Sequence, residues 1–281
     1  MTRITWAARD GDRGASQDRI YIGDHFAMVL DGASSPDRTD HDGGWYATAL
    51  GECLTARLRQ TPNVSLDQAV RESIAAIATQ HGLTPGSAPS ATLAIVRWST
   101  STVEAFVLGD SPVAVEHVDG RVEVVRDDRL AAVAQPEHQE LLEAAARHGF
   151  GFDHPDEWRA LVDAQRRARN QPGGYWIAEA TPEAADHAVR VEWPTDTIAS
   201  VLLVTDGVAA GPETYGVPPS WTDAIGVARA NLQQLVDAVH EAEASDANGR
   251  RWPRSKRHDD KAAVFVDLDL RPIHPDAVSS G

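Results

Sequence analysis

The sequence predicts an α+β fold in which mainly antiparallel sheets are covered by helices. Its predicted elements run in the order strands, two helices, four strands, an insertion, a strand, a long helix and a final strand. This order lacks the regular alternation of strand and helix that builds a doubly wound parallel sheet. The dipeptide Asp119-Gly120, between two predicted strands, is typical of a hairpin turn and favours antiparallel pairing. We therefore expect an α+β sandwich.

Strands are predicted where apolar and β-branched residues run or alternate between turn signals. They cover residues 2–8, 20–31 with a break at Gly23-Asp24, 92–98, 103–108, 113–117, 121–125, 201–205 and 262–268. Helices are predicted where apolar residues recur every three or four positions. They cover 44–58, the stretch between the capping residue Ser65 and Gly82, 136–148, 156–168 and about 220–244.

Residues 1–268 are expected to form a single domain, because a chain of 281 residues can bury one sizeable core. Between about 127 and 192 the pattern changes to two helices followed by the stretch NQPGGYWIAEATPE. We predict that this segment is a helical, lid-like insertion outside the main sheets. Residues 269–281 are expected to be a loose C-terminal tail.

The composition excludes several classes of protein. The formal net charge of −16 opposes nucleic acid or an anionic membrane as the main partner. Cys53 is the only cysteine, which rules out an internal disulfide and suits a reducing compartment. No apolar run reaches the roughly 20 residues that span a bilayer, and the N-terminus lacks the apolar stretch of a signal peptide. A cytoplasmic protein is expected.

Four aspartates stand at the ends of hydrophobic runs. Asp31, Asp110 and Asp206 follow the runs FAMVL, EAFVLG and SVLLVT, and Asp259 lies just before AAVFV. Taken singly, each could be only a polar residue in a turn beside a strand. Carboxylates that converge at a sheet edge repel one another unless cations neutralise them. Because oxygen ligands with no Cys and little His favour hard cations, the pattern predicts a Mg²⁺ or Mn²⁺ centre built on strand ends.

Seven short motifs follow one another between Arg13 and Val266: RGASQD, VLDG, GGWYA, SATLAIV, VLGDS, LLVTDG and DDKAAVFV. Each is weak alone, but seven in order at plausible spacing are specific. In this succession the chain resembles the metal-dependent protein phosphatases (the PPM, or type 2C, serine/threonine phosphatases), as a divergent member of bacterial type. The resemblance implies a four-layer α-β-β-α sandwich, with two antiparallel sheets face to face and helix pairs outside.

The resemblance also implies a site for two Mn²⁺ or Mg²⁺ ions at one end of the sandwich. Asp31 would bridge the two ions, and the carbonyl of Gly32 would bind one of them. Asp206 and Asp259 would hold the other ion. Asp18 would lie behind these ligands and hold coordinated water.

Two further residues take their expected roles from the same resemblance. Asp110 matches the ligand of a weaker third metal ion, and Arg13 matches the arginine that binds the substrate phosphate. The implied reaction is hydrolysis of phosphoserine or phosphothreonine in proteins by metal-activated water, without a covalent phosphoenzyme. The expected partner is therefore a phosphorylated protein that a separate kinase has modified. A monomer is favoured.

The chain departs from the family pattern at three places. Ala33 follows Asp31-Gly32 where eukaryotic members carry a histidine, and Gln17 stands where an acidic residue often precedes Asp18. The acidic loop ASSPDRTDHD, residues 33–42, separates motifs that usually run straight on. We expect this loop to flank the metal site and to influence the choice of substrate.

Several alternatives stay open at the level of the sequence. The ligand at the start of the last strand could be Asp260 in place of Asp259, and His258 could lie behind that ligand. The basic cluster RRWPRSKR could attract a phosphorylated substrate or be a solvated loop. The protein could also be a regulatory module that kept the fold without turnover, or a phosphatase of small metabolites.

Overall fold

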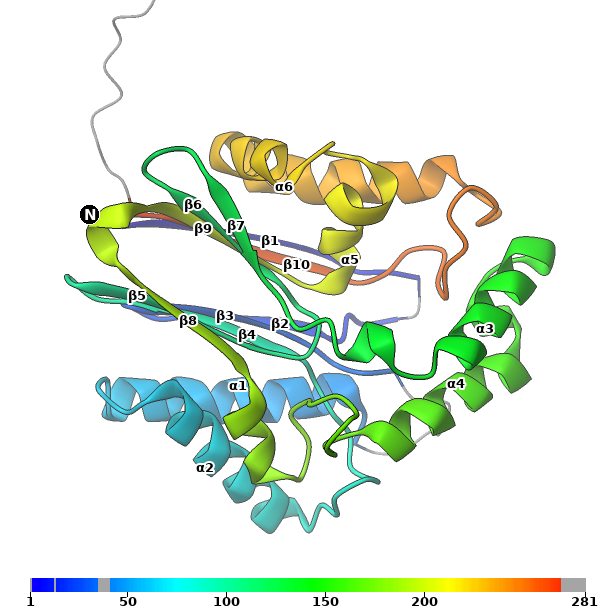
Figure 1. Cartoon of the computed structure of the whole chain (residues 1–281), viewed down its shortest axis with the longest axis horizontal. Coiled ribbons are helices and arrows are strands. Elements are labelled where there is room, and N and C mark those ends of the chain that lie inside the picture. The colour runs from blue at the N-terminus through cyan, green and yellow to red at the C-terminus, as the bar shows by residue number, and fades with distance from the viewer. Residues whose placement is uncertain (1, 13, 35–40, 269–281) are drawn as a thin grey trace, which may run out of the picture.

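Two five-stranded sheets form the centre of the molecule (Figure 1). The computed structural model describes residues 2–12, 14–34 and 41–268. One sheet has the order β1 (Arg3–Arg9), β10 (Lys261–Asp267), β9 (Ile198–Val204), β6 (Val113–His117), β7 (Val122–Val125). The other has the order β2 (Asp18–Ile22), β3 (Phe26–Asp31), β4 (Leu93–Trp98), β5 (Thr102–Leu108), β8 (Val189–Pro194). Every neighbouring pair of these strands is antiparallel, so the predicted α+β sandwich is confirmed.

Helices cover the outer face of each sheet and complete an α-β-β-α order of layers, as Figure 1 shows. The helices α1 (Gly43–Gln60) and α2 (Leu66–His81) pack on the sheet that contains β3. The long helix α6 (Trp221–Ser245) packs on the sheet that contains β10. Small and β-branched side chains fill the space between the sheets.

Strand β3 shows why the central strands are recognisable in the sequence. Met28 and Leu30 face the α1 side, whereas Ala27 and Val29 face the other sheet. A strand that is buried on both faces reads as a continuous apolar run, and FAMVL is such a run. Strand β10 is buried on both faces in the same way.

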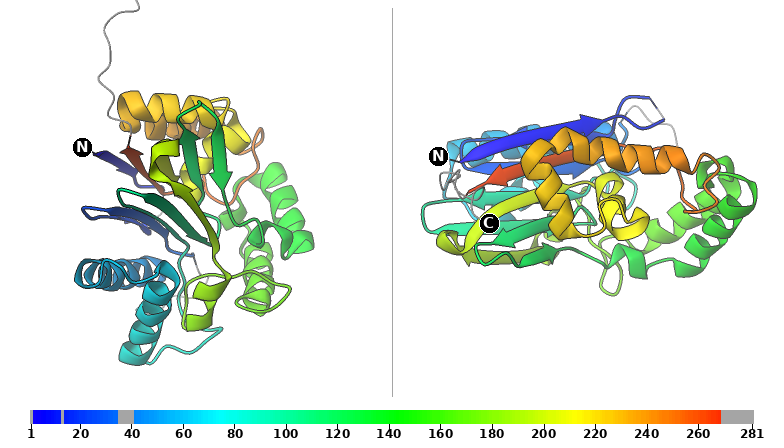
Figure 2. Two further views of the ribbon diagram at one scale, coloured as in Figure 1. Left: turned by 60° about the vertical axis from the view of Figure 1, so that its left-hand side comes forward. Right: turned by 90° about the horizontal axis from the view of Figure 1, so that it is seen from above.

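The helices α3 (Gln135–His148) and α4 (Pro155–Ala168) form a hairpin beyond one end of the sandwich (Figure 2). Both helices agree with the sequence-based prediction. The sheet resumes earlier than predicted, because β8 begins at Val189 and pairs with β5, so the segment outside both sheets does not extend to about 192. In β8, half-buried or buried residues alternate with exposed ones in VRVEWP. Such an edge strand lacks the apolar run that identifies its central neighbours.

The remaining elements are short or cap the helices. A five-residue helix, α5 (Asp206–Ala210), follows β9 and continues into a π-helical turn, Gly211–Tyr215. The Asp42 side chain accepts a hydrogen bond from Trp45 N (2.8 Å) and caps α1. Gly82 ends α2 in the left-handed conformation (φ 61°), as the sequence predicts. None of the described helices is long and apolar enough to cross a bilayer.

Three parts of the sequence-based predictions lie outside the described residues. They are Arg13, residues 35–40 of the predicted 33–42 loop, and the predicted tail 269–281.

Candidate active site

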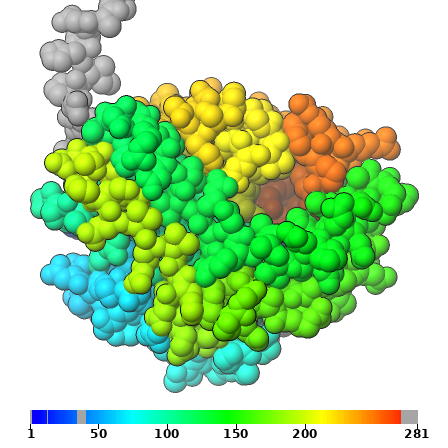
Figure 3. All heavy atoms as spheres, viewed as in Figure 1, coloured from blue at the N-terminus to red at the C-terminus, as the bar shows by residue number. Residues whose placement is uncertain are grey.

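A cleft of about 700 Å³ opens beside the helical insertion. Figure 3 shows this hollow where the α5 segment (yellow), the loop before β10 (orange) and the insertion (green) meet. Its lining from the insertion is largely apolar, with Phe152, Trp158, Leu161 and Val162. The carboxylates that line it include the four strand-end residues that the sequence singles out, Asp31, Asp110, Asp206 and Asp259. The fold therefore brings four residues together that are up to 228 positions apart in the chain.

Asp18 and Asp31 are direct neighbours in the ladder between β2 and β3. The Asp18 side chain is 8% exposed, and its Oδ2 accepts a hydrogen bond from Thr205 Oγ1 (2.7 Å). Thr205 lies at the end of β9, so this bond joins the two sheets directly beneath the cleft. The second carboxylate oxygen, Asp18 Oδ1, is buried without a hydrogen-bond partner.

Backbone crowding explains the two Asp-Gly pairs. A Cβ atom on Gly32 would lie 2.5 Å from the carbonyl oxygen of Gly43, where α1 begins. A Cβ atom on Gly207 would lie 2.0 Å from the carbonyl oxygen of Asp260, at the start of β10. Only glycine permits such approaches. The glycines therefore let two other segments pass close behind the carboxylates that precede them.

The structure separates the roles of Asp259 and Asp260. Asp260 accepts hydrogen bonds from the backbone N–H groups of Gly11 (2.8 Å) and Gln17 (2.9 Å), which ties the N-terminal segment to β10. Asp259 instead lines the cleft with Asp31 and the other carboxylates. Of the two adjacent carboxylates, Asp259 is the one available to a ligand in the cleft.

Lys256 places an ammonium group in this cluster of carboxylates. Its Nζ lies 2.5 Å from Asp259 Oδ1, and its side chain is 18% exposed. Burial alone lowers the pKa of Lys256, but the charges of Asp259 and Asp31 outweigh that effect, so the pKa lies above its ordinary value. Within the described part of the chain, Lys256 is the only cation in an ion pair with any of the aspartates 18, 31, 110, 206 and 259.

The pKa values of Asp31 and Asp206 lie above that of an ordinary aspartate. Burial, followed by the charges of Asp206 and Asp18, raises the pKa of Asp31 well above its usual value. Burial and the charge of Asp259 raise the pKa of Asp206, while the charge of Lys256 lowers it. The site thus holds more negative charge than its own cation neutralises.

Two more carboxyl groups share this shift. Burial raises the pKa of Asp18 to about 8; the Thr205 hydrogen bond opposes the shift and the charge of Asp206 adds to it. Burial and the charge of Asp206 raise the pKa of Asp110 to about 7. Asp110 follows Gly109, whose φ of 87° turns the chain after β5 so that the carboxylate faces the same cleft.

This donor set fits hard divalent cations. Every candidate ligand is an oxygen, neighbouring carboxylates raise the pKa values of Asp31 and Asp206, and Asp18 Oδ1 is a buried oxygen without a partner. Divalent cations bound by oxygen ligands relieve such repulsion, and Mg²⁺ and Mn²⁺ are the ions that suit them.

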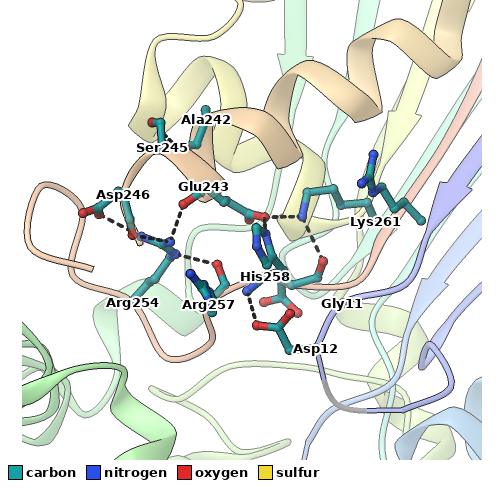
Figure 4. Close-up of polar contacts among 12 residues, drawn as sticks. Gly11, Asp12, Ala242, Glu243, Ser245, Asp246, Arg254, Arg257, His258 and Lys261 are labelled. Atoms are coloured by element: carbon teal, nitrogen blue, oxygen red, sulfur yellow. Dashed lines mark hydrogen bonds and ion pairs between the residues drawn. The ribbon is translucent and has the colours of Figure 1, made fainter. Parts of the chain in front are cut away.

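A second group of titratable residues lies beside the cleft, around Glu243 (Figure 4). Glu243 is 1% exposed, and its Oε2 accepts hydrogen bonds from Lys261 Nζ (2.7 Å) and His258 Nδ1 (3.0 Å). The His240 ring stacks on the His258 ring, with centroids 3.9 Å apart and planes 14° apart. Burial and the charge of His258 lower the pKa of His240 to about 4.

The Glu243 group does not fit a metal ion. Lone pairs of imidazole lie in the ring plane, so two stacked, nearly parallel rings cannot both direct one at the same ion. Lys261 also already neutralises the carboxylate. The group instead positions the backbone of the cleft, because Lys261 Nζ also donates to the carbonyl oxygen of Asp259 (2.9 Å). The sequence left open whether His258 supports Asp259 from behind. Its ring bonds to Glu243, and Glu243 in turn bonds to Lys261, which holds the Asp259 carbonyl.

Gln17 and Ala33, two of the departures from the family pattern, lie beside the cleft. The side chain of Gln17 contacts both ends of the 33–42 loop: Oε1 accepts from Ser34 Oγ (3.3 Å) and Nε2 donates to Asp42 Oδ2 (3.4 Å). Ala33 lines the cleft, and its N–H donates to the Ser90 carbonyl (2.9 Å). Gln17 thus fastens the loop where an acidic residue would add charge.

Three contributors to the site have no clear signal in the sequence. Lys256 belongs to a basic cluster that reads equally well as a solvated loop. Thr205 looks like an ordinary strand residue, and Glu243 like a polar residue on a helix. Thr205 and Glu243 act through partners that only the fold brings close. Lys256 pairs with Asp259, three residues further on, and the fold brings this pair to the other carboxylates.

The chain belongs to the protein phosphatase 2C family, since the model of that family matches residues 13–244. No curated protein matches the chain. The matched range covers most of the sequence; Asp18, Asp31, Asp110 and Asp206 lie within it, and Asp259 lies beyond its end.

Solved structures of bacterial serine/threonine phosphatases share the fold. The catalytic domain of PstP, in complex with two manganese ions, is 17% identical with a TM-score of 0.54, over 95% of this chain and 97% of that one. PstP/Ppp from Mycobacterium tuberculosis has the same identity and TM-score, over 95% and 99%. The PPM phosphatase MsPP from Mycobacterium smegmatis, in complex with cacodylate, is 20% identical with a TM-score of 0.58, over 95% and 98%.

Proposed function

We propose that this protein is a metal-dependent phosphatase that hydrolyses phosphoserine or phosphothreonine in proteins at a site for two divalent cations. The observation that carries the proposal is the convergence of Asp31, Asp206 and Asp259 in one cleft with a single ammonium group against them. The family and the manganese complex of PstP, a protein of the same fold, support it.

Each carboxylate has a proposed place. Asp31 and the Gly32 carbonyl would hold one ion. Asp31, Asp206 and Asp259 would hold the other. Asp110 would serve a third, weaker ion. Bound Mn²⁺ or Mg²⁺ would supply Lewis-acid chemistry that activates water and offsets charge on the phosphoryl oxygens.

The chain's own groups would orient the reactants. Thr205 holds Asp18 Oδ2, which leaves Asp18 Oδ1 free to accept a proton from ordered water in the site. The aromatic and aliphatic lining from α3 and α4 would exclude bulk water and contact apolar parts of the substrate. The substrate phosphate would be bound by Arg13, which is proposed from its match to the family motif alone.

Hydrolysis of an aryl phosphate and of a phosphothreonine peptide tests the proposal. Purified protein would be assayed in EDTA, Mg²⁺ and Mn²⁺, beside Asp206→Asn. Asp24→Asn is the matched control, because it makes the same change in charge at an exposed residue of the β2–β3 turn. We expect turnover that needs a divalent ion, persists in Asp24→Asn and is lost in Asp206→Asn. Folded wild-type protein without turnover in either metal would overturn the proposal and favour a regulatory role.

A further inference from the structure

Lysine is rare in this chain, and both lysines lie next to a proposed metal ligand. Of its 26 Lys and Arg residues only two are lysines, Lys256 and Lys261, and they flank the pair Asp259-Asp260. Both contact Asp259: Lys256 through the carboxylate (2.5 Å) and Lys261 through the backbone carbonyl (2.9 Å). Both ammonium groups of the chain, which are more compact than guanidinium groups, therefore lie in contact with the proposed metal ligand Asp259.

Lys256 is held at this place by an ordered loop. The Asp246 carboxylate accepts hydrogen bonds from the backbone N–H groups of residues 250, 251 and 252 and from Arg254 Nη1 (3.0 Å). Figure 4 shows Arg254 between Asp246 and the end of α6. The RRWPRSKR cluster is therefore a folded loop around a buried carboxylate, and the reading as a solvated loop does not apply to its centre.

The same loop is bonded to the helical insertion. The N–H of Gly151 donates to the carbonyl of Arg254 (3.0 Å), and the N–H of Phe152 donates to the carbonyl of Ser255 (2.9 Å). Lys256 Nζ lies 5.8 Å from the centre of the Phe152 ring. The ammonium group is thus enclosed between the apolar lining of the insertion and the carboxylates, within the electrostatic reach of Asp31 and Asp206.

We propose that the ammonium group of Lys256 acts as a resident cation of the metal-free site and that divalent cations bind at Asp259 by displacing it. The inference rests on the proposed metal site and adds a competitor that belongs to the chain itself. Asp259 Oδ1 already accepts hydrogen bonds from Lys256 Nζ (2.5 Å) and from the backbone N–H of Asp260 (2.9 Å). A divalent ion that takes this oxygen meets the ammonium group there, and the two like charges repel. Displacement breaks the ion pair with Asp259, and the ammonium group then meets solvent or substrate in the cleft that Lys256 lines.

Competition of this kind is reciprocal. Removing the ammonium group must strengthen metal binding, and adding metal must release the ammonium group. Coupling between two binding sites commonly changes affinity about 5- to 150-fold, and we take the lower end of this range for the ammonium group. We therefore expect Lys256→Met to bind Mn²⁺ at least about fivefold more tightly than the wild type.

Calorimetric titration with Mn²⁺ tests the first half of this reciprocity. Lys256→Met, Lys256→Arg and Arg257→Met would be compared with the wild type after removal of metal by EDTA and dialysis. Arg257→Met is the matched control, since it removes an exposed positive charge from the neighbouring residue. Tighter binding in Lys256→Met but not in Arg257→Met supports the proposal, and Lys256→Arg, which keeps the charge, is expected to stay near the wild type. Equal or weaker binding in folded Lys256→Met overturns it.

Lysine labelling of the unmodified protein tests the second half. Because only two lysines are present, acylation followed by mass spectrometry reports each one separately. Mn²⁺ should raise the labelling rate of Lys256 severalfold, whereas Lys261, which is fully buried, should stay unlabelled. An unchanged rate for Lys256 at saturating Mn²⁺ contradicts displacement. Mn²⁺ binding without these two effects defeats only this inference, whereas no Mn²⁺ binding by wild type and Lys256→Met defeats the proposed function as well.

Discussion

Two anionic regions lie side by side in this protein and are neutralised in opposite ways. Glu243, 1% exposed, has Lys261 and His258 as hydrogen-bond partners on one carboxylate oxygen. At the cleft, Asp18, Asp31, Asp110, Asp206 and Asp259 have one ion-pair partner among the described residues, Lys256, and the pKa values of the first four are raised. The first region is complete within the chain. The second needs cations from outside, which is the property of a metal site.

The two regions meet at the turn between Asp259 and Lys261. Lys261 neutralises Glu243 and holds the Asp259 carbonyl, so the closed region fixes the backbone on which the open region depends. Breaking the first region should therefore destabilise the fold, whereas breaking the second should remove activity without destabilising the metal-free protein.

The largest expected effect comes from Asp31→Asn, which alters the open region. We expect turnover to fall by about a thousandfold, because a proposed ligand shared by both ions is lost. The metal-free protein should become more stable, since one of the mutually repelling carboxylates disappears. Steady-state kinetics in Mn²⁺ and thermal unfolding in EDTA measure the two effects. A variant that keeps its activity, or that is less stable than the wild type in EDTA, would contradict the contrast.

Glu243→Gln should break the closed region. Lys261 is fully buried, and removing its partner leaves an uncompensated charge, which costs about 3–5 kcal/mol of unfolding free energy. Chemical denaturation should show this loss both in EDTA and in Mn²⁺. Glu241→Gln, at an exposed position on the same helix, is the control. A loss seen only with metal present would mean that Glu243 belongs to the open region.

Asp260→Asn and Asp259→Asn sharpen the boundary between the regions. Asp260 satisfies two backbone N–H groups, so Asp260→Asn should lower the unfolding free energy by about 1–3 kcal/mol and leave Mn²⁺ affinity nearly unchanged. Asp259→Asn should lower Mn²⁺ affinity instead. Denaturation and Mn²⁺ titration of both variants decide the matter; the opposite pattern would make Asp260 the ligand.

The stability of the metal-free protein should also depend on pH. The folded pKa of Asp18, about 8, exceeds the value of about 3.9 for an unfolded aspartate. The folded state therefore binds more protons between these values, and metal-free stability must fall as pH rises toward 8. His240, with a folded pKa of about 4, acts in the opposite direction below about pH 6.5.

The fall should therefore be clearest between about pH 6.5 and about pH 8, where Asp18 and Asp110 lose their protons. Thermal unfolding in EDTA should show the melting temperature decreasing across this interval. Asp18→Asn should flatten the curve, and Mn²⁺ should do the same in the wild type. A melting temperature that rises with pH in EDTA would rule out the raised pKa of Asp18.

The sequence was sufficient for the elements whose pattern is local. FAMVL is buried on both faces as β3, and Gly82 ends α2 as its position predicts. The edge strand β8 was missed, because a strand covered on one side alternates with polar residues and gives no apolar run. The predicted insertion is accordingly too long at its C-terminal end.

By itself, the sequence determined the sandwich, the family and the four aspartates at strand ends, since strand period and turn chemistry act over a few neighbouring residues. Only the tertiary structure decided which of Asp259 and Asp260 faces the cleft, because the choice depends on backbone amides 249 and 243 positions away. It likewise decided that the Lys256 ammonium group lies among the carboxylates of the cleft and that the Lys261 ammonium group pairs with Glu243. Electrostatic partners are chosen by distance in space, and a linear pattern does not contain that distance.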